Sequence, residues 1–346
     1  MNTISNFPDI DIYILYYLNI PTILNLMTVS KNQKQLLETL AFIKELKLFK
    51  LKILKRLKDN LLIDIAAKYN CTQFIKWVHE STNEFSYSII AIDNIIRNGN
   101  IELLEWFNNS YHDLLYDKTS ITIACKYNRV EILQWFTNYD FKYDEYAIDT
   151  AAENGNIDVL EWFIDSDYEI KYNGAINLAC GNGHVCILEW FNRHSLELKY
   201  DFTAIDNAAC NGHVDILQWF NEHNFEFKYT CDAINQAAYY GHVNILEWFN
   251  NSDLEFKYKS DAIDLASCNG HINVLEWFSN SKFEFKYTCA AVNLAANNAH
   301  IDVLDWFNNS KYEFKFTKYA IDNSSHHLHV IKWFKKTKKY IFKFGQ

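Results

Sequence analysis

Hydrophobic residues recur along the chain with a period of about 29 residues. The ten Trp, from Trp77 to Trp333, lie 27 to 29 positions apart, and most are preceded by an aliphatic pair and followed by Phe. The match extends further, because residues 232–249 and 261–278 share 11 of their 18 positions. A fixed period of this length is typical of stacked structural repeats. The pattern therefore predicts a solenoid rather than one globular core.

One period predicts two helices joined by a glycine turn and followed by an extended link. Ala262 and Ala266 place small side chains on one face of a first helix. Gly270 would end this helix, because glycine accepts the left-handed conformation. A second, largely apolar helix covers residues 272–278, and residues 284–287 alternate as in an extended strand or finger. The expected N-caps of the first helices are Asp261, Asp232, Thr203 and Thr119.

The repeats share paired small residues and a Gly-His turn. Ala-Ala occurs at 66–67, 151–152, 208–209, 237–238 and 295–296, and Gly-His at 183–184, 212–213, 241–242 and 270–271. Over roughly residues 61–346 this arrangement resembles ankyrin repeats, and is similar to the divergent ankyrin proteins of amoeba-infecting giant viruses, which carry N-G-H-x-x-V-L-E-W-F. Ala-Ile-Asp or Ala-Ile-Asn replaces the ankyrin T-P-L-H, and each unit is about four residues shorter than the ankyrin repeat. The resemblance implies an all-α solenoid of about ten 29-residue repeats, the last a degenerate C-terminal cap.

Residues 1–60 do not repeat and form a separate N-terminal segment. Their Phe-Pro start, Leu-rich helices, internal Pro and Val29-Ser30-Lys31 resemble an F-box, although Phe7 replaces the usual Leu and the usual Trp is absent. The resemblance implies binding to the linker subunit of a cullin ubiquitin ligase. The residues that would make this contact are Pro8, Ile14, Leu15, Leu18 and Pro21. The alternative is a small helical bundle that only caps the first repeat.

Composition narrows the class of protein. Only 9 Gly and 2 Pro argue against a turn-rich sandwich or barrel. The apolar runs are far shorter than the roughly 20 residues of a membrane span, and no signal peptide is expected. Eight Cys without a C-x-x-C pair indicate reduced thiols in a cytoplasmic protein, in the host cell if the source is viral.

Charge is distributed unevenly along the acidic chain, whose formal net charge is −10. Residues 31–58 carry +7 and residues 332–343 carry +6, which leaves −23 for the rest. The basic runs fit solvated helix faces. A contact with nucleic acid or anionic lipid is the alternative, but an acidic balance does not favour a general nucleic-acid binder. No nucleic-acid or membrane partner is therefore expected.

The residues that could carry chemistry recur in register, which favours structural roles. The His residues six positions before Trp alternate with Asn and Arg, which suits a turn better than a metal site. His326, His327 and His329 lack Cys or carboxylate partners at ligand spacing. The Cys positions suggest small-residue niches, and the Asp/Asn row of the first helices suggests bonds to the neighbouring repeat. Trp248 and its equivalents are expected in the core, between the helices of their own unit and against the next unit.

Positions that vary on a fixed frame are the candidates for binding. The residues twelve and nine positions before each Trp differ between repeats and would line one face of the first helices. The candidate contacts on this face are Arg97, Lys126, Glu153, Gln236, Tyr239 and Asn297.

Together these features predict a monomeric, non-catalytic protein-interaction protein with no cofactor and no metal. One hypothesis is a substrate-recognition adaptor for a host ubiquitin ligase, with the F-box-like segment on the ligase and the solenoid on an unidentified host target. The other is a stand-alone scaffold or decoy, with the N-terminal helices only capping the array.

Overall fold

The computed structural model describes residues 59–81, 85–110, 114–139 and 142–337. The F-box-like segment, with Pro8, Ile14, Leu15, Leu18 and Pro21, lies outside these residues. Every regular element in the described ranges is helical, and each repeat contains a first and a second helix. The predicted all-α repeat architecture is therefore confirmed for the part of the chain that the structure describes.

The first helices of the repeats carry odd labels and the second helices carry even labels. The first helices are α5 (Asp59–Lys68), α7 (Ile89–Asn98), α9 (Lys118–Lys126), α11 (Glu145–Glu153), α13 (Ala175–Gly181), α15 (Phe202–Cys210), α17 (Asp232–Tyr239), α19 (Asp261–Cys268), α21 (Cys289–Asn297) and α23 (Tyr319–Asp322). The second helices are α6 (Thr72–Ser81), α8 (Ile101–Ser110), α10 (Val130–Phe136), α12 (Ile157–Asp165), α14 (Val185–Arg193), α16 (Val214–Glu222), α18 (Val243–Asn251), α20 (Ile272–Asn280), α22 (Ile301–Asn309) and α24 (Leu328–Lys336).

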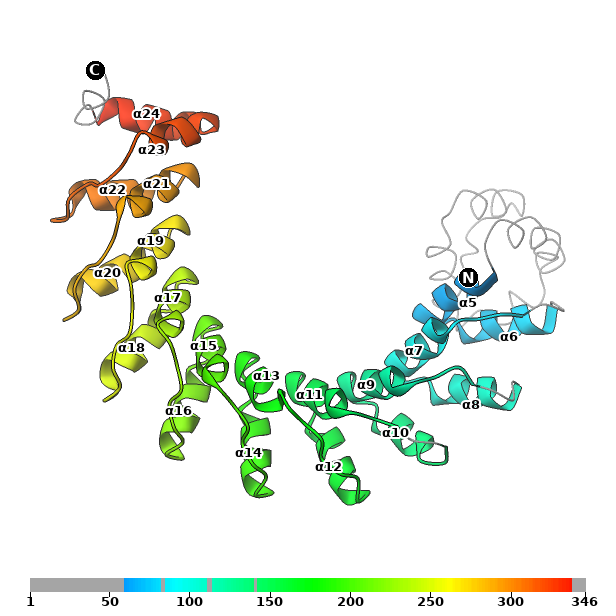
Figure 1. Cartoon of the computed structure of the whole chain (residues 1–346). Coiled ribbons are helices and arrows are strands. Elements are labelled where there is room, and N and C mark those ends of the chain that lie inside the picture. Colours follow the sequence, from blue (N-terminus) through cyan, green and yellow to red (C-terminus); the bar gives the residue numbers. More distant parts are fainter. Residues whose placement is uncertain (1–58, 82–84, 111–113, 140–141, 338–346) are drawn as a thin grey trace, which may run out of the picture. The chain divides into compact units, whose positions relative to one another are not determined.

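The chain divides into two compact units. Among the described residues, unit 1 contains those from 59 to 150 together with Asp158–Lys171, and unit 2 contains Ala151–Ile157 and those from 172 to 337. Within unit 2 the first helices α13 to α23 lie side by side in chain order, each with its second helix beside it (Figure 1). Because each first helix contacts the preceding and the following first helix, unit 2 is a stack of repeats.

The core of each repeat lies between the small face of the first helix and the aliphatic and Phe side chains of the second. Ala233 and Ala237 of α17 are fully buried, as is Leu246 of α18. Phe249, the residue after the Trp, has only 1% of its surface exposed. Small residues allow the helices to approach closely, so the large rings of the second helix fill the remaining space.

The Trp row differs from the prediction. Trp190 and Trp219 are buried, but Trp248 is only half-buried. The Trp248 indole donates to Oε1 of Gln218 at 3.2 Å, and its ring stacks on Phe227, both in the preceding repeat. These contacts therefore run to the preceding repeat, not to the next one. The prediction of a uniformly buried Trp row is wrong, because the indole N–H turns outward to a polar partner and the following Phe takes the core position.

The turn between the two helices adopts the predicted left-handed conformation. Gly270 has φ +77°, and Gly241 has φ +79°. Where a repeat lacks glycine, Asn70, Asn128 or Ala299 occupies the same place with φ between 54° and 64°. A Cβ built on Gly241 would lie 2.7 Å from Nδ1 of His271, so the His of one repeat packs directly on the turn of the repeat before it.

The links between repeats are extended, as predicted, but form no strand in the described residues. Their alternating side chains point in and out, with Phe285 and Tyr287 half-buried and Glu284 and Lys286 exposed. Neighbouring links contact each other directly. The Tyr200 hydroxyl donates to the Glu226 carbonyl at 2.9 Å, and the Lys228 ammonium lies 4.6 Å from the centre of the Tyr200 ring.

The Asp/Asn row joins consecutive repeats, as predicted. Asp264 accepts the backbone N–H of Thr288 at 2.8 Å and its hydroxyl at 2.6 Å. The Thr288 hydroxyl oxygen in turn accepts the N–H of Ala290 and so caps α21. Burial raises the pKa of Asp264, and the two bonds from Thr288 lower it in part. Asp64 and Asp206 make the same pair of bonds to Ser88 and Thr230, so these carboxylates position the hydroxyl at the start of the next helix.

The helix caps lie slightly earlier than predicted. Asp261 and Asp232 are the first residues of α19 and α17, and neither residue is the N-cap. The caps of α15 and α9 are Asp201 and Asp117 rather than Thr203 and Thr119; they accept the N–H groups of these Thr residues. Asp201 also bonds the amide of Asn177 in the preceding repeat, a contact that local sequence does not reveal.

The last repeat departs from the pattern, as predicted for a terminal unit. Its first helix α23 spans four residues and continues into a 3-10 turn at Asn323–His326. None of the helices in the described ranges has the length and apolar character needed to cross a bilayer.

Candidate protein-binding face

The solvent-facing side of the first helices forms the candidate site. We call it the first-helix face and define it by the residues twelve, nine and eight positions before each Trp. In unit 2 these residues carry no formal charge from α13 to α21. They are Leu178, Gly181, Asn182, Asn207, Cys210, Asn211, Gln236, Tyr239, Tyr240, Leu265, Cys268, Asn269, Leu294, Asn297 and Asn298. Depletion of charge is typical of the central part of protein interfaces.

An asparagine clamp holds the frame beneath this face. Eight positions before the Trp, the side-chain amide donates to a backbone carbonyl of the preceding repeat. Asn211 reaches the Gly181 carbonyl at 2.6 Å, and Asn269 reaches the Tyr239 carbonyl at 2.8 Å. Asn98 makes the same bond in unit 1, to the Ala67 carbonyl at 2.8 Å. Asn182 is an exception, because its amide donates to the Leu178 carbonyl of its own helix at 2.9 Å. The position is therefore structural wherever its amide reaches the preceding repeat.

Two tyrosines interrupt the clamp. Tyr240 stands at the clamp position in α17's turn and has 51% of its surface exposed, with the Tyr239 ring 4.7 Å away. Tyr127 stands at the same position in unit 1 and is 37% exposed, with the Arg97 guanidinium 5.4 Å from its ring centre. A large exposed ring replaces an inter-repeat hydrogen bond at both places. Tyrosine is among the residues that most often dominate binding energy at interfaces.

The structure distributes the predicted contacts over both units. Gln236 and Tyr239 lie one turn apart on α17, and both are partly exposed. Asn297, partly exposed at the end of α21, donates its amide to Oδ1 of Asn298. Glu153, also partly exposed, belongs to unit 2.

In unit 1, Lys126 is exposed and Arg97 is partly exposed. The Arg97 side chain donates to Oδ1 of Asn94 at 3.2 Å, and its carbonyl accepts two bonds from the Arg129 guanidinium. Arg97 therefore contributes to the frame as well as to the surface.

Sequence reasoning missed Tyr127 and Tyr240 as candidate contacts. The signal was present, because six of the eight residues at this position from the second to the ninth repeat are Asn. The two Tyr residues that replace Asn at this position were the informative ones. The structural role of the Asn, which makes the exceptions meaningful, is visible only from the bonds to the preceding repeat.

The His row is an inter-repeat contact rather than a chemical site. His271 bonds the backbone of Tyr239 and packs on Gly241, both in the preceding repeat. Burial lowers the pKa of His271 and of His242, and their hydrogen bonds to the preceding repeat raise it in part. No group of three His, Cys, Asp or Glu side chains in the described ranges is arranged to hold a metal ion.

The cysteines fall into two environments. Cys125 and Cys180 are fully buried, and burial raises the pKa of both thiols. This fits the predicted small-residue niche. Cys210 and Cys268 are partly exposed on the first-helix face, and burial also raises the pKa of their thiols. A raised pKa keeps a thiol protonated at neutral pH and disfavours a nucleophilic role.

A match to a protein-family model supports the repeat assignment. Residues 148–231 match the family model of ankyrin repeats in three copies. Among solved structures, the ankyrin repeat domain of human ASB11 is similar to this chain with 16% sequence identity and a TM-score of 0.42, over 54% of this chain and 96% of that domain. No curated protein matches the chain.

Ankyrin repeats are generally non-catalytic modules for protein–protein interaction. The helix pair of the matched segment recurs in the other described repeats. The described chain therefore has the fold of an ankyrin-type solenoid, of which residues 148–231 are recognised ankyrin repeats.

Proposed function

We propose that the protein is a non-catalytic adaptor that holds a target protein on the first-helix face. In the fuller form of the proposal, residues 1–60 act as an F-box and bind the linker subunit of a host cullin-type ubiquitin ligase. The target would then be presented to the ligase in the host cytoplasm. Support for the F-box comes from its sequence resemblance alone, and support for target binding comes from the face itself.

The exposed Tyr240 is the observation that carries the target-binding proposal. It occupies a position where the repeats on either side use Asn211 and Asn269 to clamp the preceding repeat. The chain gives up one inter-repeat hydrogen bond here, which is worth roughly 0.5–1.5 kcal/mol. It exposes an aromatic pair on an uncharged face instead. The loss of a stabilising bond in return for an exposed aromatic pair indicates a role in binding rather than in stability.

Substitution of Tyr240→Asn tests this proposal without weakening the frame. The new amide can donate to the Cys210 carbonyl as the neighbouring Asn residues do, so the free energy of unfolding should be unchanged or higher. Affinity capture from amoeba lysate should show proteins that bind the wild type and are lost with the variant. The matched control is Tyr319→Asn, which removes a still more exposed ring from the last repeat. Identical sets of captured proteins from both variants and the wild type would contradict the proposal.

The ligase arm has a separate test. The wild-type chain should capture the purified linker subunit, and Leu15→Asp or Leu18→Asp should abolish this capture. Absence of capture by the wild type would leave a stand-alone scaffold or decoy as the function. In that case deletion of residues 1–58 should lower the stability of the first repeats, because those residues would serve only as a cap.

A further inference from the structure

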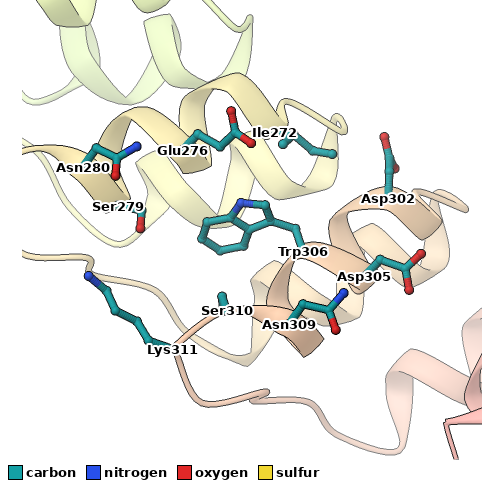
Figure 2. Close-up of a pocket in the computed structure, with 10 residues that line it drawn as sticks. All are labelled: Ile272, Glu276, Ser279, Asn280, Asp302, Asp305, Trp306, Asn309, Ser310 and Lys311. Atoms are coloured by element: carbon teal, nitrogen blue, oxygen red, sulfur yellow. The ribbon is translucent and has the colours of Figure 1, made fainter.

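An open groove of about 640 Å³ lies between the second helices α20 and α22. It belongs to unit 2 and lies on the second helices, whereas the first-helix face lies on the first helices. Figure 2 shows the Trp306 side chain projecting from α22 into the space between the two helices, with Glu276 of α20 above it. Asp302, Asp305 and Lys311 also line the groove.

The groove carries three carboxylates that no described cation neutralises. Glu276, Asp302 and Asp305 form no ion pair within the described ranges. Asp302 accepts the N–H of Val303, and Asp305 accepts the indole N–H of Trp333. The ammonium of Lys311, the one basic residue of the lining, lies 5.3 Å from the centre of the Tyr312 ring. The lining therefore has a formal net charge of −2.

Trp306 differs from its equivalents in the adjacent repeats. The indoles of Trp277 and Trp333 donate to Glu247 and Asp305 of the preceding repeat at 2.7 and 2.6 Å. The Trp306 indole has no such bond to Glu276, although Glu276 occupies the equivalent position. The ring stacks near Phe285 and Tyr312, with centroids 5.5 and 6.0 Å away, and the side chain remains partly exposed to the groove.

We propose that this groove binds a Lys or Arg side chain presented by a basic segment of a partner protein. A cation over an indole ring is attracted by the negative face of the ring. The carboxylates of the lining supply the opposite charge, and the side chains of Glu276 and Asp302 can accept hydrogen bonds from a guanidinium or ammonium group. Asp305 already accepts the indole N–H of Trp333 and contributes mainly its charge. Both features favour a cationic side chain, and neither favours an acidic or apolar segment.

The composition of the groove is specific to this joint in unit 2. The same three positions contain at least one uncharged side chain in each of the three joints that precede it. The sets are Glu189, Asp215 and Gln218; Gln218, Asn244 and Glu247; and Glu247, Asn273 and Glu276. Among these four joints, only α20–α22 has a carboxylate at all three positions. The preceding joint therefore provides an internal reference in which Asn273 stands where the groove has Asp302.

Fluorescence anisotropy with a fluorescein-labelled hexaarginine peptide tests the proposal on the full chain. Asp302→Asn copies the side chain of the preceding joint and should weaken binding by up to about fivefold, the effect of a surface ion pair worth up to about 1 kcal/mol. The matched control is Asp215→Asn, which removes the same charge from the equivalent position of α16. It should leave the affinity nearly unchanged. Tyr240→Asn should also have no effect, which separates this groove from the first-helix face.

The Trp indole N–H signals in ¹⁵N-labelled protein provide a direct second measurement. Titration with the same peptide should shift the Trp306 signal, assigned by its loss in Trp306→Phe, and leave the signal of buried Trp219 in place. An unshifted Trp306 signal would overturn the proposal. So would equal weakening by Asp302→Asn and Asp215→Asn, because binding would then follow the total charge. Formation of dimers through the basic residues 332–343 of a second copy, detected by sedimentation, would replace the partner segment with self-association and also overturn it.

Discussion

At the residue scale, the contact between His and Gly of consecutive repeats makes the turn intolerant of a side chain. Gly241 combines φ +79° with a His271 ring 2.7 Å from where a Cβ would lie. Gly241→Ala should therefore lower the free energy of unfolding by at least about 1 kcal/mol, since left-handed alanine alone costs this much. Urea denaturation followed by circular dichroism measures the change.

Ala299 provides the reverse experiment, because it occupies the same turn with φ 64°. Ala299→Gly should stabilise the chain or leave it unchanged. A loss of stability in Ala299→Gly as large as that in Gly241→Ala would show that the left-handed conformation is not the controlling factor.

The half-buried rings of His242 and His271 should make stability depend on pH. Burial lowers the pKa of His242 and His271 below their ordinary value of 6.5. The unfolded chain therefore binds protons first as the pH falls, so the stabilisation is complete above pH 6.5 and is lost as the pH falls through the lowered pKa values. Urea midpoints measured between pH 7.5 and 5 should fall over this range.

The double variant His242→Asn/His271→Asn is the control, because Asn100 and Asn156 already occupy this position in other repeats. Its urea midpoint should fall less steeply with acid than that of the wild type. Parallel slopes for the two proteins would assign the pH dependence to other groups.

At the scale of the helix, the structure exchanges the expected roles of Trp and Phe. Phe249→Ala should cost about 3–5 kcal/mol, the usual loss for a buried aromatic side chain. Trp248→Ala should cost less, because its indole is only half-buried and its hydrogen bond to Gln218 is exposed. Thermal and urea unfolding of the two variants measure the difference. A larger loss of stability in Trp248→Ala than in Phe249→Ala would contradict this assignment of the core position to Phe.

Much of each helix pair was predictable from local sequence, whereas the joints between pairs were not. The Ala-rich first helix, the Gly270 turn and the apolar second helix follow from side-chain size and backbone freedom within one unit. The Asp row was correctly expected to bond the neighbouring repeat. The caps were placed too late, and the clamp was not recognised because it depends on an acceptor in the preceding repeat. The free indole of Trp306 has no counterpart in the sequence pattern at all.

At the scale of the whole molecule, the hydrogen bonds that join repeats in the described residues reach to the adjacent repeat. In the Asp/Asn row, the hydrogen bond from Thr230 to Asp206 spans 24 residues. The clamp bond from Asn211 to Gly181 spans 30. Stability in such an array is nearly a sum of repeat and neighbour contributions. Phe249→Ala should therefore accelerate hydrogen exchange mainly in α15–α20.

Phe334→Ala, in the last repeat, should affect mainly α21–α24, because a terminal repeat has a single neighbour. Hydrogen exchange resolved by peptide mass spectrometry distinguishes the two patterns. Uniform loss of protection along the chain in both variants would contradict the repeat model and indicate one cooperative core.

The short reach of these bonds also bears on how such a chain can change length. Each 29-residue period contains the acceptors for the following repeat and the donors for the preceding one, as with Asp206 and Thr230 on either side of one joint. A tandem duplication of 29 codons, or 87 nucleotides, would therefore insert a unit whose two edges already match its neighbours. An insertion much shorter or longer than one period of 27 to 29 residues would break the match at both edges. Unequal recombination between similar periods could thus lengthen or shorten the binding surface in whole steps while every joint remained intact.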